Sequence, residues 1–169
     1  MLVYVYYQPN EGGTQKYLVF RDVAVSVSDA PSSSPVVGVL LARWYDPALH
    51  DHWSTTAAVP GNYSTYKLEA KTGYLMTAAP AGKASVELED CLSTRSGHSD
   101  HLIAEKGFCA AHDYQRLRTA GWVYSQPQAQ TVPLYRCYSE KEHSHFASNQ
   151  SDCENVGTLE HLLGYALSQ

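Results

Sequence analysis

The stretch LYRCYSEKEHSHFASNQSDCENVGTLEHLLGYAL, residues 134–167, contains the pattern that decides the fold. It opens with alternating apolar and polar residues, carries a histidine before an aromatic residue at His145-Phe146, and closes at Gly164-Tyr165. The same order of features occurs twice earlier, with histidines at 52 and 101 and glycines at 73 and 121. The period is about 45 residues, which is typical of repeat proteins. The sequence therefore predicts three degenerate copies of one unit.

Each copy begins with strand-like alternation, turns, and returns through a second short strand that carries the histidine. A helical turn or two is predicted next, at 66–70, 110–120 and 158–163, because a glycine then follows in the helix-terminating position. No copy can bury a face alone, so we expect the copies to close around a pseudo-threefold axis. A β-trefoil also has three units of this size, but its usual Gln-x-Trp motif is absent.

The predicted fold class is therefore mainly β with short helices, in a single domain over residues 1–169. Residues 1–36 are expected to add N-terminal strands. The three repeats are expected at 37–82, 83–130 and 131–169.

Four cysteines fall at matching places in the second and third repeats. Cys91 and Cys137 match each other, and Cys109 and Cys153 follow ahead of the predicted helices, so we expect Cys91–Cys109 and Cys137–Cys153 disulfides. Each would stabilise the fold by about 3 kcal/mol on the chain-entropy model. Paired cysteines indicate an oxidising compartment, and a secreted protein is expected. The alternatives are free thiols or a disulfide between two chains.

Opposite charges recur in the repeats, with their signs exchanged in the second. The set is Arg43 with Glu69, Arg136 with Glu160, and Asp90 with Arg116 or Arg118. Losing one partner of a buried ion pair costs several kcal/mol, so a reversal of both signs predicts a structural ion pair in each repeat. These residues are expected to hold the repeats together and not to bind ligand.

The sequence contains eight histidines, several in close pairs such as His50 and His52, and such pairs can ligate zinc. The second histidine of each pair recurs at one place per repeat, which instead predicts a structural role. No nucleophile motif or phosphate-binding glycine loop is present, and Glu87 and Glu89 are expected to be solvated acids on a strand. We therefore predict that the chain is not an enzyme. The enzymatic alternative is a secreted hydrolase with a carboxylate pair.

Charge and composition limit the partners. The net charge is -5, and no run of lysine and arginine interleaved with aromatics is present, so nucleic acid is not an expected partner. Apolar stretches such as 36–42 are far shorter than the roughly 18 to 20 residues of a bilayer helix, so no membrane span is expected. Thirteen tyrosines against three phenylalanines suit a binding surface. This composition, together with disulfide-linked repeats, favours a carbohydrate-binding scaffold.

Calcium ions take six to eight oxygen ligands, so acidic loops are the candidate metal sites. The preferred set lies in the second repeat, which departs most from the shared pattern. Its predicted metal ligands are Asp100, Glu105 and Asp113, and its predicted sugar-binding residues are Glu105, His112 and Asp113. The second choice is Asn149, Asp152 and Glu154 in the third repeat. The alternative for either set is a solvated loop.

The motifs Leu134-Tyr135-Arg136-Cys137-Tyr138, His145-Phe146, Asp152-Cys153-Glu154 and Gly164-Tyr165 resemble a tandem repeat appended to secreted proteins and hydrolases. In size, three-unit organisation and paired cysteines the whole chain resembles the galactose-specific, calcium-dependent lectins of sea anemones. This resemblance implies recognition of terminal galactose through a bound Ca²⁺, without catalysis, in a secreted homodimer. It also implies a structural role for Asp152 and Glu154, which match the widespread repeat. The runner-up is a metal-independent cell-wall or matrix adhesion module that binds polysaccharide.

Overall fold

The computed structural model describes residues 4–5, 18–19, 37–59, 63–93 and 98–168. The chain divides into two compact units, residues 1–33 and residues 34–169. In the first unit, β1 (Tyr4–Val5) and β2 (Leu18–Val19) pair with each other in an antiparallel sheet of their own. These two strands lie within residues 1–36, where N-terminal strands are expected, and they pair with each other and not with the larger sheet.

The second unit is a nine-stranded antiparallel sheet, which confirms the prediction of a mainly β fold. Its strands form three trios. The first trio is β3 (Gly38–Asp46), β4 (Asp51–Thr55) and β5 (Lys67–Met76); the second is β6 (Ser85–Ser93), β7 (Asp100–Glu105) and β8 (Gln115–Tyr124); the third is β9 (Thr131–Ser139), β10 (Ser144–Ser148) and β11 (Thr158–Leu167). In every trio the first strand pairs with both of the others.

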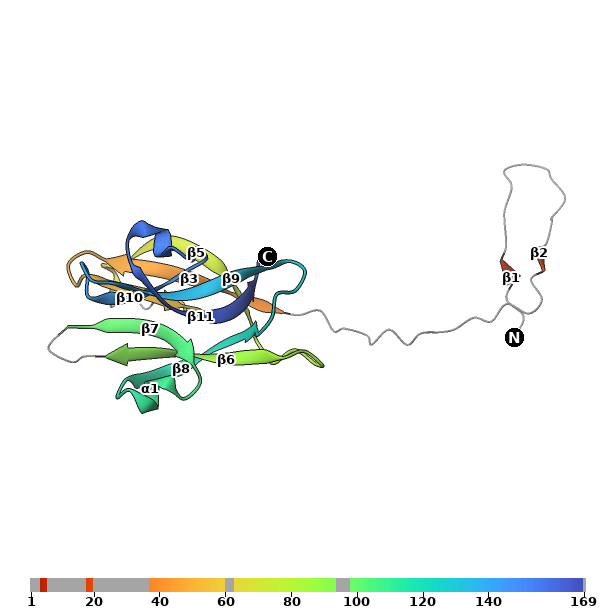
Figure 1. The fold of residues 1–169 in the computed structure, drawn as a ribbon, viewed down its shortest axis with the longest axis horizontal. Coiled ribbons are helices and arrows are strands. Elements are labelled where there is room, and N and C mark those ends of the chain that lie inside the picture. The colour runs from red at the N-terminus through yellow and green to blue at the C-terminus, as the bar shows by residue number, and fades with distance from the viewer. Residues whose placement is uncertain (1–3, 6–17, 20–36, 60–62, 94–97, 169) are drawn as a thin grey trace. The chain divides into compact units, whose positions relative to one another are not determined.

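Helices are short in the described part of the chain. They are α1 (Phe108–Ala111), which lies beside β6 and β8 (Figure 1), and a 3-10 turn, η3 (Cys153–Asn155). No helix of the described residues has the length and apolar character needed to cross a bilayer.

The helices predicted at 66–70, 110–120 and 158–163 are wrong. These residues fall largely in β5, β8 and β11, and only the start of the second range belongs to α1. Leucine, lysine, glutamate and alanine favour helices, but propensity is a weak preference. Here the backbone of each segment hydrogen-bonds along the first strand of its own trio, and this tertiary pairing prevails.

The glycines at the ends of the predicted helices instead allow the third strands of the trios to approach one another closely. Gly73, Gly121 and Gly164 lie inside the third strands, at φ values of 124°, 145° and 138°. A Cβ at any of them would come within 3.0 Å or less of an atom of another trio's third strand; at Gly121 it would lie 2.7 Å from the Leu75 Cβ. One residue pair joins each third strand to the next: Met76 with Trp122, Tyr124 with Tyr165, and Leu167 with Tyr74. The three trios thus close into one sheet where only glycine fits.

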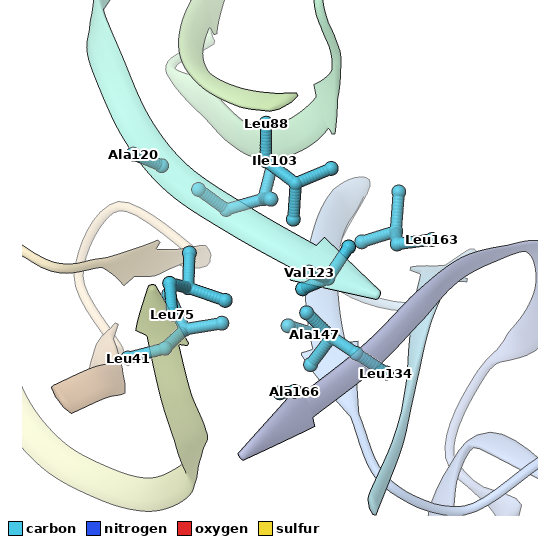
Figure 2. Close-up of a cluster of buried hydrophobic side chains, with 10 residues drawn as sticks. All are labelled: Leu41, Leu75, Leu88, Ile103, Ala120, Val123, Leu134, Ala147, Leu163 and Ala166. Atoms are coloured by element: carbon cyan, nitrogen blue, oxygen red, sulfur yellow. The ribbon is translucent and has the colours of Figure 1, made fainter. Parts of the chain in front are cut away.

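All three trios contribute to one buried core, which Figure 2 shows from within. Its members are Leu41, Leu75, Leu88, Ile103, Ala120, Val123, Leu134, Ala147, Leu163 and Ala166. The strands alternate, so the residues on either side of each core position face away from it.

Both predicted disulfides, Cys91–Cys109 and Cys137–Cys153, are confirmed, and they use all four cysteines. Two disulfides indicate an oxidising compartment. In the first trio Trp44 stands at the place of Cys91 and Cys137, opposite Trp53.

Candidate binding site

Histidines at matching places on the second strands link the trios to one another. They are His52 on β4, His101 on β7 and His145 on β10. The Nδ1 atom of His101 lies 2.6 Å from a carboxylate oxygen of Asp51, and that of His145 lies 2.8 Å from Asp100. The backbone N–H groups of both histidines donate to the same carboxylates, and the N–H of the third histidine donates to the Ser144 hydroxyl. Each histidine is therefore held by the trio next to its own, which agrees with the predicted structural role.

No zinc site emerges from the described histidines. The one group of three acidic, histidine or cysteine side chains whose ligand atoms lie within 4.8 Å of one another, among the residues described, is Glu89, Cys91 and Cys109. Its cysteines form a disulfide and offer no thiolate. The expectation of a solvated Glu89 is wrong, because its buried carboxylate accepts from the backbone N–H groups of Gly107 and Cys109 and from Arg116.

The predicted ion pairs are confirmed in all three trios. The Nε atom of Arg43 lies 2.6 Å from Glu69, that of Arg136 lies 2.9 Å from Glu160, and that of Arg118 lies 3.5 Å from Asp90. In the second trio the buried partner is the acid: burial raises the pKa of Asp90, against hydrogen bonds from Thr55 and Trp53 that lower it.

Two of these pairs belong to larger polar clusters with the same plan. The Arg43 cluster comprises Arg43, Tyr45, His52 and Glu69 with Glu154 of the third trio. The Arg136 cluster comprises Arg136, Tyr138, His145, Glu160 and His161 with Glu105 and Phe108 of the second trio. Each lies where two trios meet, and in each an arginine, a tyrosine, a histidine and a glutamate occupy matching strand positions.

In the Arg43 cluster every nitrogen of the guanidinium donates a hydrogen bond. Its Nε atom donates to Glu69, and its Nη1 and Nη2 atoms donate to the two oxygens of Glu154 at 2.8 and 2.9 Å. The Nη1 atom also donates to the Ala147 carbonyl, and the guanidinium lies over the Phe146 ring. All three nitrogens of this guanidinium are therefore bonded within the protein.

In the Arg136 cluster the guanidinium is only partly satisfied. Its Nε atom donates to Glu160, but its buried Nη1 atom has no hydrogen-bond partner, and the nearest acid, Glu105, stands 3.7 Å away. The Phe108 ring covers the guanidinium at 4.4 Å. Leaving a buried donor of a charged group unpaired costs free energy, so such a group calls for an explanation.

The acids of the Arg136 cluster reach the surface. Side-chain exposure is 31% for Glu105 and 34% for Glu160, and the Oε1 atom of Glu105 lies 2.5 Å from the Nε2 atom of His161. The cluster therefore offers partly exposed acceptors beside a buried donor. A hydroxyl group can both donate to such acceptors and accept from such a donor.

The Arg136 cluster also holds a charged histidine. Burial lowers the pKa of His145, but hydrogen bonds to Asp100 and Glu160 outweigh it and raise the pKa to about 9. Burial likewise acts on Glu160, raising its pKa, and the bonds from His145 and Arg136 more than reverse this, so that the pKa of Glu160 is lowered. Two cations, Arg136 and His145, thus face the carboxylates of Asp100, Glu105 and Glu160. That balance suits a neutral polar ligand better than an anion.

The structure distributes the preferred predicted residues around the second trio. Glu105 belongs to the Arg136 cluster, and the ring of His112 stacks on Phe108 at 3.9 Å, on the rim of that cluster. Asp113 follows α1 at a positive φ of 59°. Asp100 is bonded to His145 and to the Tyr114 hydroxyl. Asp100, Glu105 and Asp113 do not form a group with all ligand atoms within 4.8 Å.

The second-choice residues are bonded within the protein. Asn149 donates to the backbone carbonyls of Thr72 and Pro133, and Asp152 accepts from the backbone N–H of Glu154. Glu154 itself binds Arg43 and accepts from the Ser148 hydroxyl.

Sequence reasoning found the charge pairs but missed Phe108, Tyr138 and the difference between the two arginines. The sequence signal for the cluster is the order Arg, Tyr, His, Glu, which the first and third trios share. No local signal distinguishes an arginine whose outer nitrogens are bonded from one with an unpartnered nitrogen.

Comparison of the chain with protein-family models, with curated proteins and with solved structures finds no match.

Proposed function

We propose that the chain is a secreted carbohydrate-binding protein, without catalytic activity, whose binding site is the Arg136 cluster. The observation that carries the proposal is the unpartnered Nη1 donor of Arg136 beside the partly exposed acids Glu105 and Glu160. A sugar hydroxyl accepts from such a donor and donates to such acids at the same time. Clusters of planar polar groups next to aromatic rings are typical of sites for polar organic ligands.

The three trios are, in this proposal, degenerate copies of one repeat arranged about a pseudo-threefold axis. Three features support it: the shared strand pairing, the glycine junctions, and the histidine links that run from each trio to the next. A repeat protein can lose a side chain's partner in one copy and keep it in another, and the two arginine clusters differ in that way.

Aromatic rings would supply the apolar contact that a sugar ring needs. Phe108 stacks between Arg136 and His112. The exposed His112 ring and the Tyr138 ring, which packs on His145, are therefore the rings that remain for a sugar. A sugar whose hydroxyls engage Arg136 and Glu105 would lie close to the exposed His112, which the sequence also predicted as sugar-binding.

The residues predicted for calcium do not fit the ion as they stand. The Glu105 carboxylate faces Arg136 and His161, and that of Asp100 is bonded to His145 and Tyr114. A cation there would face the guanidinium and the imidazolium, and Ca²⁺ requires oxygen ligands that are free to converge. This favours direct, metal-independent recognition, as in the polysaccharide-binding alternative; a calcium requirement is retained only as an outcome to be tested.

Galactose-terminated glycans are the first ligands to test, because the chain resembles galactose-specific lectins. A homodimer, which the same resemblance implies, would present two Arg136 clusters and gain avidity on a cell surface.

The test is calorimetric titration of lactose into the protein, with calcium and after chelation. We expect Arg136→Lys, which removes the forked donor, and Glu105→Gln each to weaken binding at least about tenfold, or 1.4 kcal/mol. Glu140→Gln, on the exposed turn between β9 and β10, is the matched control and should bind like the unmodified protein.

The outcomes of this titration distinguish calcium-dependent from metal-independent binding and test the assignment of the site. Loss of binding on chelation would restore calcium to the site, and binding that survives chelation would favour the metal-independent mode. Folded Arg136 and Glu105 variants that bind normally would refute the site, and heat in neither condition would remove galactose and leave other polysaccharides to be tried.

A further inference from the structure

The Arg43 and Arg136 clusters differ in the acid that faces the outer nitrogens of the guanidinium. Both have a guanidinium whose Nε atom is bonded to the glutamate of the third strand and whose face lies over a phenylalanine ring. At Arg43 the two outer nitrogens donate to both oxygens of Glu154, whereas the matching Nη1 atom of Arg136 has no hydrogen-bond partner and lies 3.7 Å from Glu105. Glu154 therefore supplies at Arg43 the hydrogen-bonded carboxylate that Arg136 lacks.

The turn that presents Glu154 has a strained backbone. Cys153, Glu154 and Asn155 have φ values of 52°, 59° and 58°, so three consecutive residues other than glycine adopt the left-handed conformation. L-residues visit this region singly and reluctantly, because the Cβ approaches the following carbonyl. Strain of this kind persists only where surrounding contacts enforce it, and it concentrates at sites of function.

Several contacts hold the turn in place. Cys153 is joined to Cys137 by the disulfide, the Asp152 carboxylate accepts from the Glu154 N–H at 3.1 Å, and the Ser148 hydroxyl donates to Glu154 Oε1 at 2.7 Å. Their combined effect is to point the Glu154 carboxylate at Arg43.

We propose that Glu154 occupies, from within the chain, a second saccharide-binding site at Arg43. The inference rests on the proposed function of the Arg136 cluster. A carboxylate and two neighbouring sugar hydroxyls both present a pair of oxygens to the outer nitrogens of a guanidinium, so one can take the other's place. Glu69, Tyr45 and His52 then stand at the places of Glu160, Tyr138 and His145, except that burial lowers the pKa of His52 whereas the pKa of His145 is raised.

The second trio provides no third site. Asp90 replaces the arginine, Leu92 the tyrosine and Leu117 the glutamate, and the guanidinium of Arg118 is paired with the buried Asp90 carboxylate at 3.5 Å. The second trio therefore lacks the arginine, tyrosine and glutamate that the two clusters share.

The experiment is calorimetric titration of lactose into the full chain and into Glu154→Ala. The unmodified protein should bind lactose at one site per chain, and Glu154→Ala should bind at two. The double variant Arg43→Lys with Glu154→Ala should return to one site, because the forked donor is lost again. Glu140→Ala, which removes an equal charge from an exposed turn, should stay at one site.

A folded Glu154→Ala protein that still binds at one site would overturn the inference and leave the Arg136 site standing. Absence of lactose binding in the unmodified protein would instead remove galactose from the proposed function, and its absence in a folded Glu154→Ala as well would overturn the inference, so the two failures are distinguishable. Melting temperature and near-ultraviolet circular dichroism establish folding.

If Glu154→Ala does not fold, two measurements replace it. Glu154→Gln keeps the size of the side chain and weakens its hold on Arg43, so it should show a second, weaker site. In the unmodified protein, backbone amide resonances of residues 153–157 should shift at lactose concentrations well above those that saturate the first site. A single site in the glutamine variant, or no such shift, would refute the inference.

Discussion

His145 should make the stability of this protein fall as the pH rises through the alkaline range. Its imidazole lies between the carboxylates of Asp100 and Glu160, with N–O distances of 2.8 and 3.3 Å, and only 13% of the side chain is exposed. Burial lowers the pKa of His145, but the bonds to both acids raise it to about 9 from the ordinary 6.5. The folded protein therefore holds a proton that the unfolded chain has already released.

The pKa rise sets both the size and the sign of the effect. One pH unit corresponds to 1.36 kcal/mol, so a rise from 6.5 to about 9 amounts to about 3 kcal/mol. A group whose pKa is raised by folding contributes fully below the unfolded pKa and loses its contribution as the pH climbs through the folded one. The stabilisation is therefore complete below pH 6.5 and lost as the pH rises through about 9.

Urea denaturation of the unmodified protein and of His145→Gln, at several pH values from about 6 to 10, measures this directly. The free energy of unfolding of the unmodified protein should exceed that of the variant by about 3 kcal/mol more at the acid end than at the alkaline end. His143→Gln, at an exposed histidine two residues earlier, should show the same pH dependence as the unmodified protein. Parallel curves for the unmodified protein and His145→Gln would refute the reasoning.

Three further changes test the fold. Gly121→Ala places a Cβ 2.7 Å from the Leu75 Cβ at a φ of 145°, and should lower the free energy of unfolding by about 3 kcal/mol. Gly82→Ala, whose added Cβ has no atom within 4 Å, should lower it by only about 1 kcal/mol. The midpoints of urea denaturation distinguish the two variants. Replacing both Cys137 and Cys153 by alanine opens a loop of 16 residues and should cost about 3 kcal/mol, which comparison with the reduced and oxidised parent checks. Asp90→Ala leaves a buried indole N–H and a hydroxyl without their acceptor, and should cost about 2 kcal/mol in thermal unfolding; an unchanged melting temperature would contradict its structural role.

Ion pairs and disulfides, in which one residue requires a partner of a given type, were predictable from the sequence. The Arg43 and Arg136 pairs, with the reversed pair at Asp90, followed from opposite charges at matching places, and the disulfides followed from matching cysteines. A buried charge or thiol without its partner would be costly, so such residues are retained or exchanged together.

The segments predicted as helices show why other features were not predictable. Residues 158–163 contain good helix formers followed by Gly164, but they form part of β11 because β9 supplies the hydrogen-bond partners. The same glycine would suit a helix end or a positive-φ position in a strand, and only the neighbouring strand decides between them.

The sequence by itself predicted the mainly β character, the two disulfides and the charge pairs, because each of these is written in residue types at a fixed spacing. Only the tertiary structure decided that glycines join the third strands, that His101 and His145 bind acids of the adjacent trio, and that Glu154 bonds both outer nitrogens of Arg43 while the Nη1 atom of Arg136 has no hydrogen-bond partner. These are contacts between segments up to 111 residues apart. Their geometry depends on how the trios pack around a common core, and no local pattern records it.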